Sequence, residues 1–118
     1  MAQKTTICYY IAPIGGNPIK KFLDSLSEKQ QAKILRIFQY IEQYGLRSII
    51  PHLKKLTGTP LWEIRILGRD NIRVIYVTAR RNTALILHGF IKKSPKTPKK
   101  EIKTALIRYR EWQARIDK

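Results

Sequence analysis

The stretch that decides the fold spans residues 61–93 and reads LWEIRILGRDNIRVIYVTARRNTALILHGFIKK. Two clusters of turn-forming residues, 68–71 and 80–82, divide it into three short runs that are rich in Ile, Val, Leu and aromatic residues. Short apolar runs separated by turns are typical of consecutive strands that pair with one another. The stretch therefore predicts a three-stranded antiparallel meander.

Parity assigns the side chains of these strands to two faces, because successive side chains of a strand point to opposite sides. One face is apolar throughout and is expected to lie in the core: Trp62, Ile64, Ile66, Ile72, Val74, Tyr76, Ile86, His88 and Phe90. The other face carries charges among aliphatic residues: Glu63, Arg65, Arg73 and Lys93, beside Ile75, Val77, Leu87, Gly89 and Ile91. Charges in the middle of strands are costly unless that face meets water, a partner or a substrate.

The flanking segments supply one more strand and three helices. Residues 5–12, TTICYYIA, predict a strand that Pro13 ends. Asn17 and Pro18 suit the start of a first helix, and Ser27 with Gln30 forms a capping box for a second, which ends near Gly45. Residues 49–60 form a connector, and a last helix opens near Pro98 and runs towards Asp117. The order strand, two helices, three strands, helix predicts an α+β fold in a single domain over residues 1–118.

Charge is the strongest global feature. Lys and Arg number 24 against 8 Asp and Glu, a formal net charge of +16, which favours a polyanion or an acidic protein as partner. Cys8 is the only cysteine, so no disulfide framework is expected, and its apolar surroundings predict a small buried residue. The sequence shows neither a membrane-span-like apolar run nor a signal-peptide pattern, and we expect a cytoplasmic protein with no membrane partner.

Several kinds of catalytic site find no support in the residues. His52 and His88 are the only histidines, and no Cys, His or carboxylate set has metal-ligand spacing, so neither a metal nor another cofactor is expected. His88 falls on the apolar face, where a hydrogen-bonded core histidine is expected. Gly15 and Gly16 lack the spacing of a phosphate-binding loop and are interpreted as turn residues.

The charged sheet face suits a phosphodiester. Arg binds phosphate oxygens through a two-pronged guanidinium and Lys acts as a point charge, so Arg65, Arg73 and Lys93, with Lys92 at the rim, can stabilise a phosphodiester transition state. RNA supplies its own nucleophile, the 2′-hydroxyl, and an enzyme then needs only a base, an acid and cations. The residues leave the base and acid open among Glu63, Lys92 and Lys93, because a Lys crowded by cations has a lowered pKa. Gly89 would leave room beside them, and the structural alternative is a Glu63–Arg65 ion pair.

Further lysines extend the positive surface on both sides of this face and predict contacts to the RNA backbone without sequence readout. They are Lys54 and Lys55 in the connector, and Lys96, Lys99 and Lys100 after the last strand.

The order and spacing of LWEIR, RVIY, LHGFIKK and SPKTPKKEI, with the early NPIKKFLDSL helix, resemble the RelE/ParE toxin superfamily, close to its HigB type. The resemblance covers nearly the whole chain. It implies a RelE-like fold of the microbial ribonuclease type, a curved antiparallel sheet packed by a helix pair. It also implies the toxin of a type II toxin–antitoxin system that cleaves messenger RNA on the ribosome as an endoribonuclease. A cognate antitoxin would neutralise it within a hetero-oligomer.

The resemblance also places the site. Glu63 and Arg65 stand at active-site positions of the first meander strand, Arg73 at the Arg of the second, and Lys93 at the basic residue after the third. Glu63 replaces a basic residue of RelE itself. Tyr109 is a candidate for the Tyr that such enzymes place near the C-terminus, although its helical spacing predicts core.

Two other functions remain open. The first is inhibition of DNA gyrase without catalysis, as in the ParE branch, and the second is a basic RNA-binding module. The constellation of Arg65, Arg73 and Lys93 favours a ribonuclease over both. An antitoxin segment is expected against the charged face or beside Lys93, because one helix is not expected to cover Ile75, Leu87 and Ile91 together.

Overall fold

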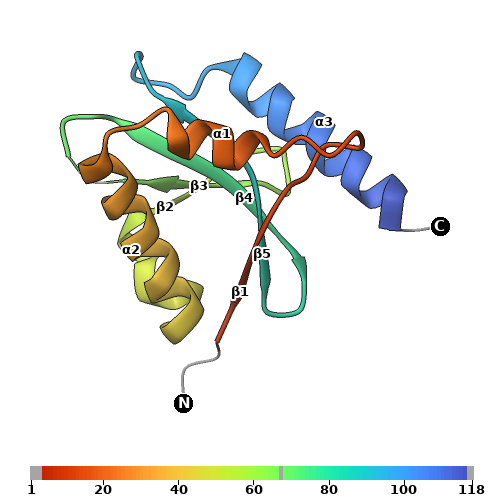
Figure 1. Cartoon of the computed structure of the whole chain (residues 1–118), viewed down its shortest axis with the longest axis horizontal. Helices are drawn as coiled ribbons and strands as arrows, with labels where there is room; N and C mark the ends of the chain where they lie inside the picture. The colour runs from red at the N-terminus through yellow and green to blue at the C-terminus, as the bar shows by residue number, and fades with distance from the viewer. Residues whose placement is uncertain (1–3, 67, 117–118) are drawn as a thin grey trace.

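The computed structural model describes residues 4–66 and 68–116 of the chain. All three helices form where the sequence predicts them (Figure 1). Helix α1 is Pro18–Asp24, and the Asn17 side chain accepts a hydrogen bond from the Lys20 amide at 3.0 Å. Helix α2 is Glu28–Tyr44 and begins with the predicted capping box of Ser27 and Gln30. Helix α3 is Lys99–Ile116.

The sheet has five strands in the order β1-β5-β4-β3-β2. Strands β3, Trp62–Arg65, β4, Ile72–Arg80, and β5, Thr83–Ile91, pair antiparallel in sequence as predicted. The prediction of an entirely antiparallel sheet is wrong, because β1, Thr6–Tyr9, pairs in parallel with β5. A parallel pair needs a long connection, and the intervening helices and strands provide it.

A short strand that the sequence did not predict lies at the far edge of the sheet. Strand β2, Leu53–Lys55, follows the 3₁₀ segment η1, Leu46–His52, and pairs antiparallel with β3. With Lys54 and Lys55 in it, this segment lacks the apolar alternation that marks a strand. It becomes a strand because the edge of β3 is available for pairing.

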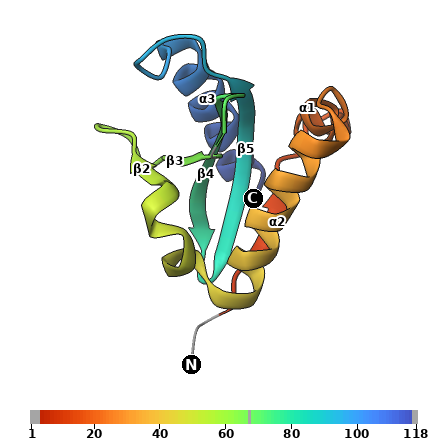
Figure 2. The same ribbon diagram turned by 90° about the vertical axis from the view of Figure 1, so that its left-hand side faces the viewer.

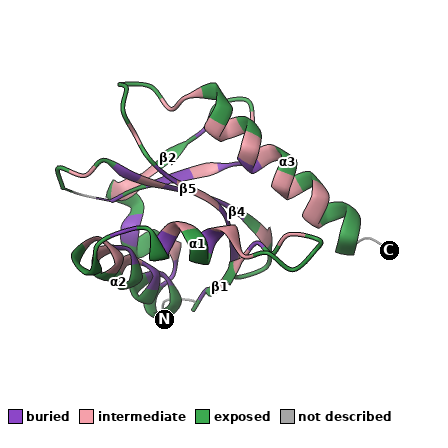
Figure 3. Cartoon of the chain, turned by 45° about the horizontal axis from the view of Figure 1, so that its top comes forward, coloured by how far each residue is buried: buried purple, intermediate pink, exposed green. Residues whose placement is uncertain are grey.

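Helices cover both faces of the sheet, so the fold has three layers (Figure 2). Helices α1 and α2 pack on one face over a core that includes Ile34, Phe38, Ile64 and Val74. Helix α3 lies on the other face over Ile75, Val77, Leu85, Leu87 and Phe90, and contributes Ala105 and Leu106. The burial pattern follows this arrangement, with the outer surface of α3 exposed and its inner surface partly covered (Figure 3). One helix therefore does hide Ile75 and Leu87, and only Ile91 stays 44% exposed.

A β-bulge in β5 overturns the predicted faces of its second half. Ile75 pairs with His88 and the next residue, Tyr76, pairs with Ile86, so Leu87 is an extra residue in β5. An extra residue reverses the alternation beyond it. His88 and Phe90 therefore face α3 rather than the α1–α2 core. Gly89 faces α1, where a Cβ would come within 2.4 Å of the Phe22 ring, so the predicted space for a catalytic base is filled by Phe22.

Cys8 is exposed on β1, which contradicts its predicted burial. Its neighbours in the strand, Ile7 and Tyr9, pack against the α1–α2 core instead, so the alternation of the strand turns Cys8 outward. Among the residues that the structure describes, no helix is long and apolar enough to cross a membrane.

Candidate functional site

Four basic side chains surround one buried carboxylate on the α3 face of the sheet, near its β2 edge. In the strand register Lys54 of β2 pairs with Glu63 of β3, and Arg65 of β3 pairs with Arg73 of β4. Lys92, just after β5, experiences the charges of Glu63, Arg73, Lys54 and Arg65. We call these five residues the cationic cluster. With four cations and one carboxylate, the cluster has a large excess of positive charge, which suits a phosphate group.

Glu63 is at the centre of the cluster and is fully buried, at 0% exposure. Its Oε1 lies 3.4 Å from Nε of Arg73, and its Oε2 accepts a hydrogen bond of 2.5 Å from the Thr97 hydroxyl. A buried carboxylate is costly unless it is paired and hydrogen-bonded. Thr97 supplies a hydrogen bond to Oε2, whereas Arg73 pairs with Oε1 by charge, without a hydrogen bond. The predicted alternative of a Glu63–Arg65 pair is replaced by the Glu63–Arg73 pair.

The two arginines present their guanidinium groups differently. The Arg73 side chain is 13% exposed, and its Nη1 donates to the carbonyl oxygen of Ile72 at 3.1 Å. The Arg65 side chain is exposed, and its Nη2 lies 3.5 Å from the carbonyl oxygen of Pro51. Both arginines can thus exchange weak backbone contacts for phosphate oxygens, with Arg73 held near the centre and Arg65 nearer the solvent.

Lys92, rather than Lys93, belongs to the cluster, because the bulge at Leu87 shifts the alternation by one residue. Burial lowers the pKa of the Lys92 ammonium, and nearby Arg73, Lys54 and Arg65 lower it further, while Glu63 opposes them. Lys93 is exposed and lines a shallow depression beside the cluster together with Asn71, Arg73, Lys92, Ser94 and Pro95.

The remaining lysines predicted to bind RNA divide between the two faces. Lys54 joins the cluster, whereas the Nζ of Lys55 lies 5.3 Å from the centre of the Trp62 ring, which packs against the α1–α2 core. Lys96, Lys99 and Lys100 are exposed, on the segment before α3 and in its first turn. Thr97 is the site residue that sequence reasoning missed: its place before Pro98 indicates only a cap for α3, and nothing in the residue pattern links it to Glu63.

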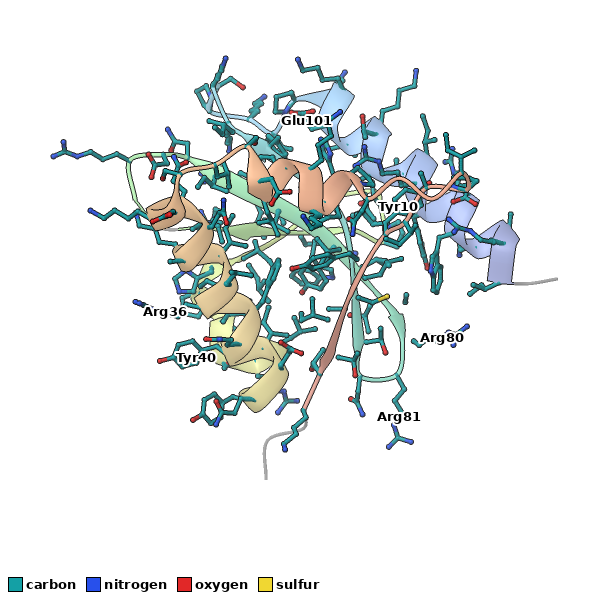
Figure 4. The ribbon with its side chains drawn as sticks, viewed as in Figure 1. Tyr10, Arg36, Tyr40, Arg80, Arg81 and Glu101 are labelled. Atoms are coloured by element: carbon teal, nitrogen blue, oxygen red, sulfur yellow. The ribbon has the colours of Figure 1, made fainter. Side chains whose placement is uncertain are left out.

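His88 is hydrogen-bonded, as predicted, but its partners come from α3. Nη1 of Arg108 donates to its Nδ1 at 3.1 Å, which leaves Nε2 to carry the proton towards Glu101 Oε1, also at 3.1 Å. Burial lowers the pKa of this imidazole, and Arg108 adds to that effect while Glu101 opposes it. In Figure 4 the Glu101 side chain lies near the start of α3. His88 therefore fastens α3 to the sheet as a neutral ring.

Tyr109 is partly buried and packs against the core, on the side that its spacing predicted. Its ring stacks on Trp112 with centroids 6.3 Å apart and packs against the α3 side of the sheet. Among the described residues no group of three or more His, Cys, Asp or Glu side chains is placed to hold a metal ion.

Comparison with known proteins identifies the family of the chain. The model of the family described as phage derived protein Gp49-like (DUF891) matches residues 21–110, from α1 into α3, and this range includes the whole cationic cluster. The chain belongs to the Gp49-like family. This family consists of toxin-like proteins of the RelE/Gp49 type, which typically pair with an antitoxin. Membership in the family makes this Gp49-like protein a candidate toxin of a toxin–antitoxin system. A search of curated proteins found none that matches it.

Proposed function

We propose that this Gp49-like protein is the toxin of a type II toxin–antitoxin system and acts as an endoribonuclease that cleaves messenger RNA on the ribosome without a catalytic metal, as HigB-type toxins of the RelE superfamily do. The observation that supports the proposal is the cationic cluster, in which Arg65 and Arg73 pair across neighbouring strands and Lys92 lies within reach of both charges. A protein that only blocked gyrase would have no need of this arrangement.

The chemistry divides among the cluster residues. The 2′-hydroxyl of RNA attacks the adjacent phosphorus and the bond to the 5′ oxygen breaks, which yields a 2′,3′-cyclic phosphate and a 5′-hydroxyl. Arg73 and Arg65 stabilise the negative charge that gathers on the non-bridging oxygens. Lys92, whose pKa is lowered, accepts the 2′-hydroxyl proton in its neutral form, and water protonates the leaving oxygen. Glu63 is too deeply buried to reach the hydroxyl, and it orients Arg73 instead.

The flanking lysines have a binding role in this proposal. Lys93 at the rim of the cluster, with Lys96, Lys99 and Lys100, contacts phosphates on either side of the cleaved bond. The antitoxin that neutralises the protein presents an acidic surface, because opposite charges speed encounter and like charges at an interface are costly.

The test is induced expression of the protein in bacterial cells, followed by mapping of transcript 5′ ends. We expect new ends inside translated codons. Intact messages accompanied by DNA damage would overturn the proposal and support a gyrase inhibitor.

Substitution of Arg73 tests the site itself. Arg73→Ala is expected to lower the cleavage rate by on the order of 100–1,000-fold and abolish growth arrest, because it removes a group that stabilises the transition state. Arg81→Ala is the matched control, since Arg81 projects from the β4–β5 turn, where Figure 4 shows it at the end of the molecule away from Glu101. A fully toxic Arg73→Ala variant would remove Arg73 from the site.

A further inference from the structure

The segment between β5 and α3 reaches the centre of the cationic cluster through one side chain, Thr97. Its hydroxyl donates to Glu63 Oε2 at 2.5 Å, across 34 residues of sequence. This is a short hydrogen bond to a fully buried carboxylate, which has no access to water that could take the place of the hydroxyl. Thr97 therefore determines how the carboxylate of Glu63 is turned.

The other carboxylate oxygen of Glu63 is set against Arg73 in an incomplete contact. Its Oε1 lies 3.4 Å from Arg73 Nε, and both atoms are buried without a hydrogen-bond partner. Two complementary buried groups this close gain by moving together, but Thr97 holds the carboxylate by its other oxygen. The Nε–H of Arg73 is thus kept from closing fully onto Glu63, and Arg73 stays where it lines the depression, with its Nη1 on the Ile72 carbonyl oxygen.

We propose that Thr97 is a positioning residue of the ribonuclease site. It anchors Glu63, and Glu63 in turn orients the Arg73 guanidinium for the scissile phosphate. This inference rests on the proposed function for its kinetic consequence, whereas its structural consequence, a fixed Arg73, is independent of it. Phosphate binding draws the Nη atoms from the Ile72 carbonyl, and the contact between Arg73 Nε and Glu63 shortens as the transition state forms.

Three variants separate the hydroxyl from the shape of the side chain. Thr97→Val keeps the branched shape and removes the donor, whereas Thr97→Ser keeps the donor. Thr104→Val is the matched control, because within the described residues the Thr104 hydroxyl donates to the Lys100 carbonyl oxygen of α3 and to no residue of the cluster. The assay is single-turnover cleavage of messenger RNA on programmed ribosomes, with the maximal rate and the half-saturating protein concentration measured separately.

We expect Thr97→Val to lower the maximal rate by roughly 10–100-fold, because misplacing a catalytic group by about 1 Å costs up to about that much. The half-saturating concentration should change by less than about threefold, since a positioning residue acts on the transition state more than on binding. Thr97→Ser and Thr104→Val should stay within about threefold of wild type on both measures. If Thr97→Val fails to fold by circular dichroism, Thr97→Ala is tested with the same expectation.

A second readout does not depend on cleavage. In the ¹⁵N-resolved NMR spectrum the Arg73 Nε–H signal, assigned by its loss in Arg73→Lys, should show a fixed side chain in wild type and Thr97→Ser. In Thr97→Val it should shift and broaden or become mobile. A Thr97→Val protein with wild-type rate and an unchanged Arg73 signal would overturn the inference.

The two proposals fail in different ways. Absence of cleavage by the wild type would refute the ribonuclease, and the Arg73 signal would still decide whether Thr97 positions that side chain. Cleavage by the wild type that requires Arg73 but is indifferent to the Thr97 hydroxyl would refute the positioning role alone.

Discussion

At the scale of single residues, the position of Lys92 distinguishes this site from a generally basic surface. Its side chain is partly buried, and burial together with the charges of Arg73, Lys54 and Arg65 lowers the pKa of its ammonium group against the opposing effect of Glu63. Its neighbour Lys93 is exposed on the rim. The two lysines are adjacent in sequence and differ in surroundings, so each serves as the other's control.

Lys92→Met is expected to lower the cleavage rate by about 100–10,000-fold, the range lost when a general base is removed, whereas Lys93→Met should change it by less than about tenfold. The proposed base acts in its neutral form, so the wild-type rate should rise with pH until Lys92 has lost its proton, at a pH below 10.5, the ordinary pKa of Lys. Single-turnover rates on ribosomes across a pH series measure both effects. Equal losses in the two variants would contradict the assignment.

Sequence reasoning named all five residues of the cluster as candidates, but it placed Lys93, rather than Lys92, on the same face as Arg73. Strand alternation correctly placed Glu63, Arg65 and Arg73 on one face. It failed beyond Leu87, because an extra residue in a strand leaves no mark in an apolar run and reverses everything after it. Because of that reversal, Lys92 lies on the face where the sequence predicted Lys93, and His88 faces α3 rather than the α1–α2 core.

At the scale of elements, the close approach of α1 to β5 depends on Gly89. A Cβ at this position would meet the Phe22 ring at 2.4 Å. Gly89→Ala is therefore expected to destabilise the fold by about 1–3 kcal/mol, as overpacking does. Urea denaturation measures the change. Gly16→Ala is the control, since a Cβ there would meet only Ala12 at 3.8 Å.

The double variant Gly89→Ala with Phe22→Leu should recover part of the lost stability, because the smaller side chain gives the methyl group room. A double variant less stable than the sum of the two single changes would show that the Phe22 contact is not the cause.

The attachment of α3 to the sheet should depend on pH through His88. The folded state lowers the pKa of His88 below its ordinary value of 6.5, so the folded chain binds this proton more weakly than the unfolded chain. The stability that the neutral His88 ring contributes is therefore complete above pH 6.5, and it is lost as the pH falls towards the lowered pKa of His88. A protonated ring would also carry a hydrogen on Nδ1, facing the Arg108 donor.

The measurement is urea denaturation at about pH 7.5 and about pH 5.5 for wild type and His88→Gln. The wild type should lose more stability over this interval than the variant. Parallel losses in the two proteins would show that other groups govern the acid response.

The helices and the meander could be predicted because each is specified by local features: caps, turns and alternation. Asn17, Ser27 and Gln30 act within a few residues of their own positions. Strand β2 and the parallel pairing of β1 have no such local signal. Lys54 and Lys55 become strand residues because they pair with the edge of β3. Strand β1 likewise forms because it pairs with the edge of β5.

At the scale of the whole molecule, a net charge of +16 should make binding to RNA and ribosomes weaken steeply with salt. Lys99→Ala with Lys100→Ala should flatten the log–log salt dependence by roughly 0.7 for each phosphate of single-stranded RNA that the variant no longer neutralises. The affinity is measured by titration with ribosomes at several salt concentrations.

Lys29→Ala with Arg36→Ala is the control of equal charge. Both residues are exposed on α2, on the layer opposite to the cluster, and Figure 4 shows Arg36 on its outer surface. The same flattening in both double variants would mean that total charge, and not an RNA path along α3, sets the affinity.

The parallel pairing of β1 with β5 has a consequence for folding during synthesis of the protein. Thr6 pairs with Thr83, so the first strand of the sheet to emerge during synthesis waits for the last one. Lys92 and Thr97 emerge later still, and α3, which covers Ile75 and Leu87, follows them. A growing polypeptide therefore holds the arginines of the cluster without the residues that arrange them. The fold itself delays the finished site until α3 has emerged from the ribosome.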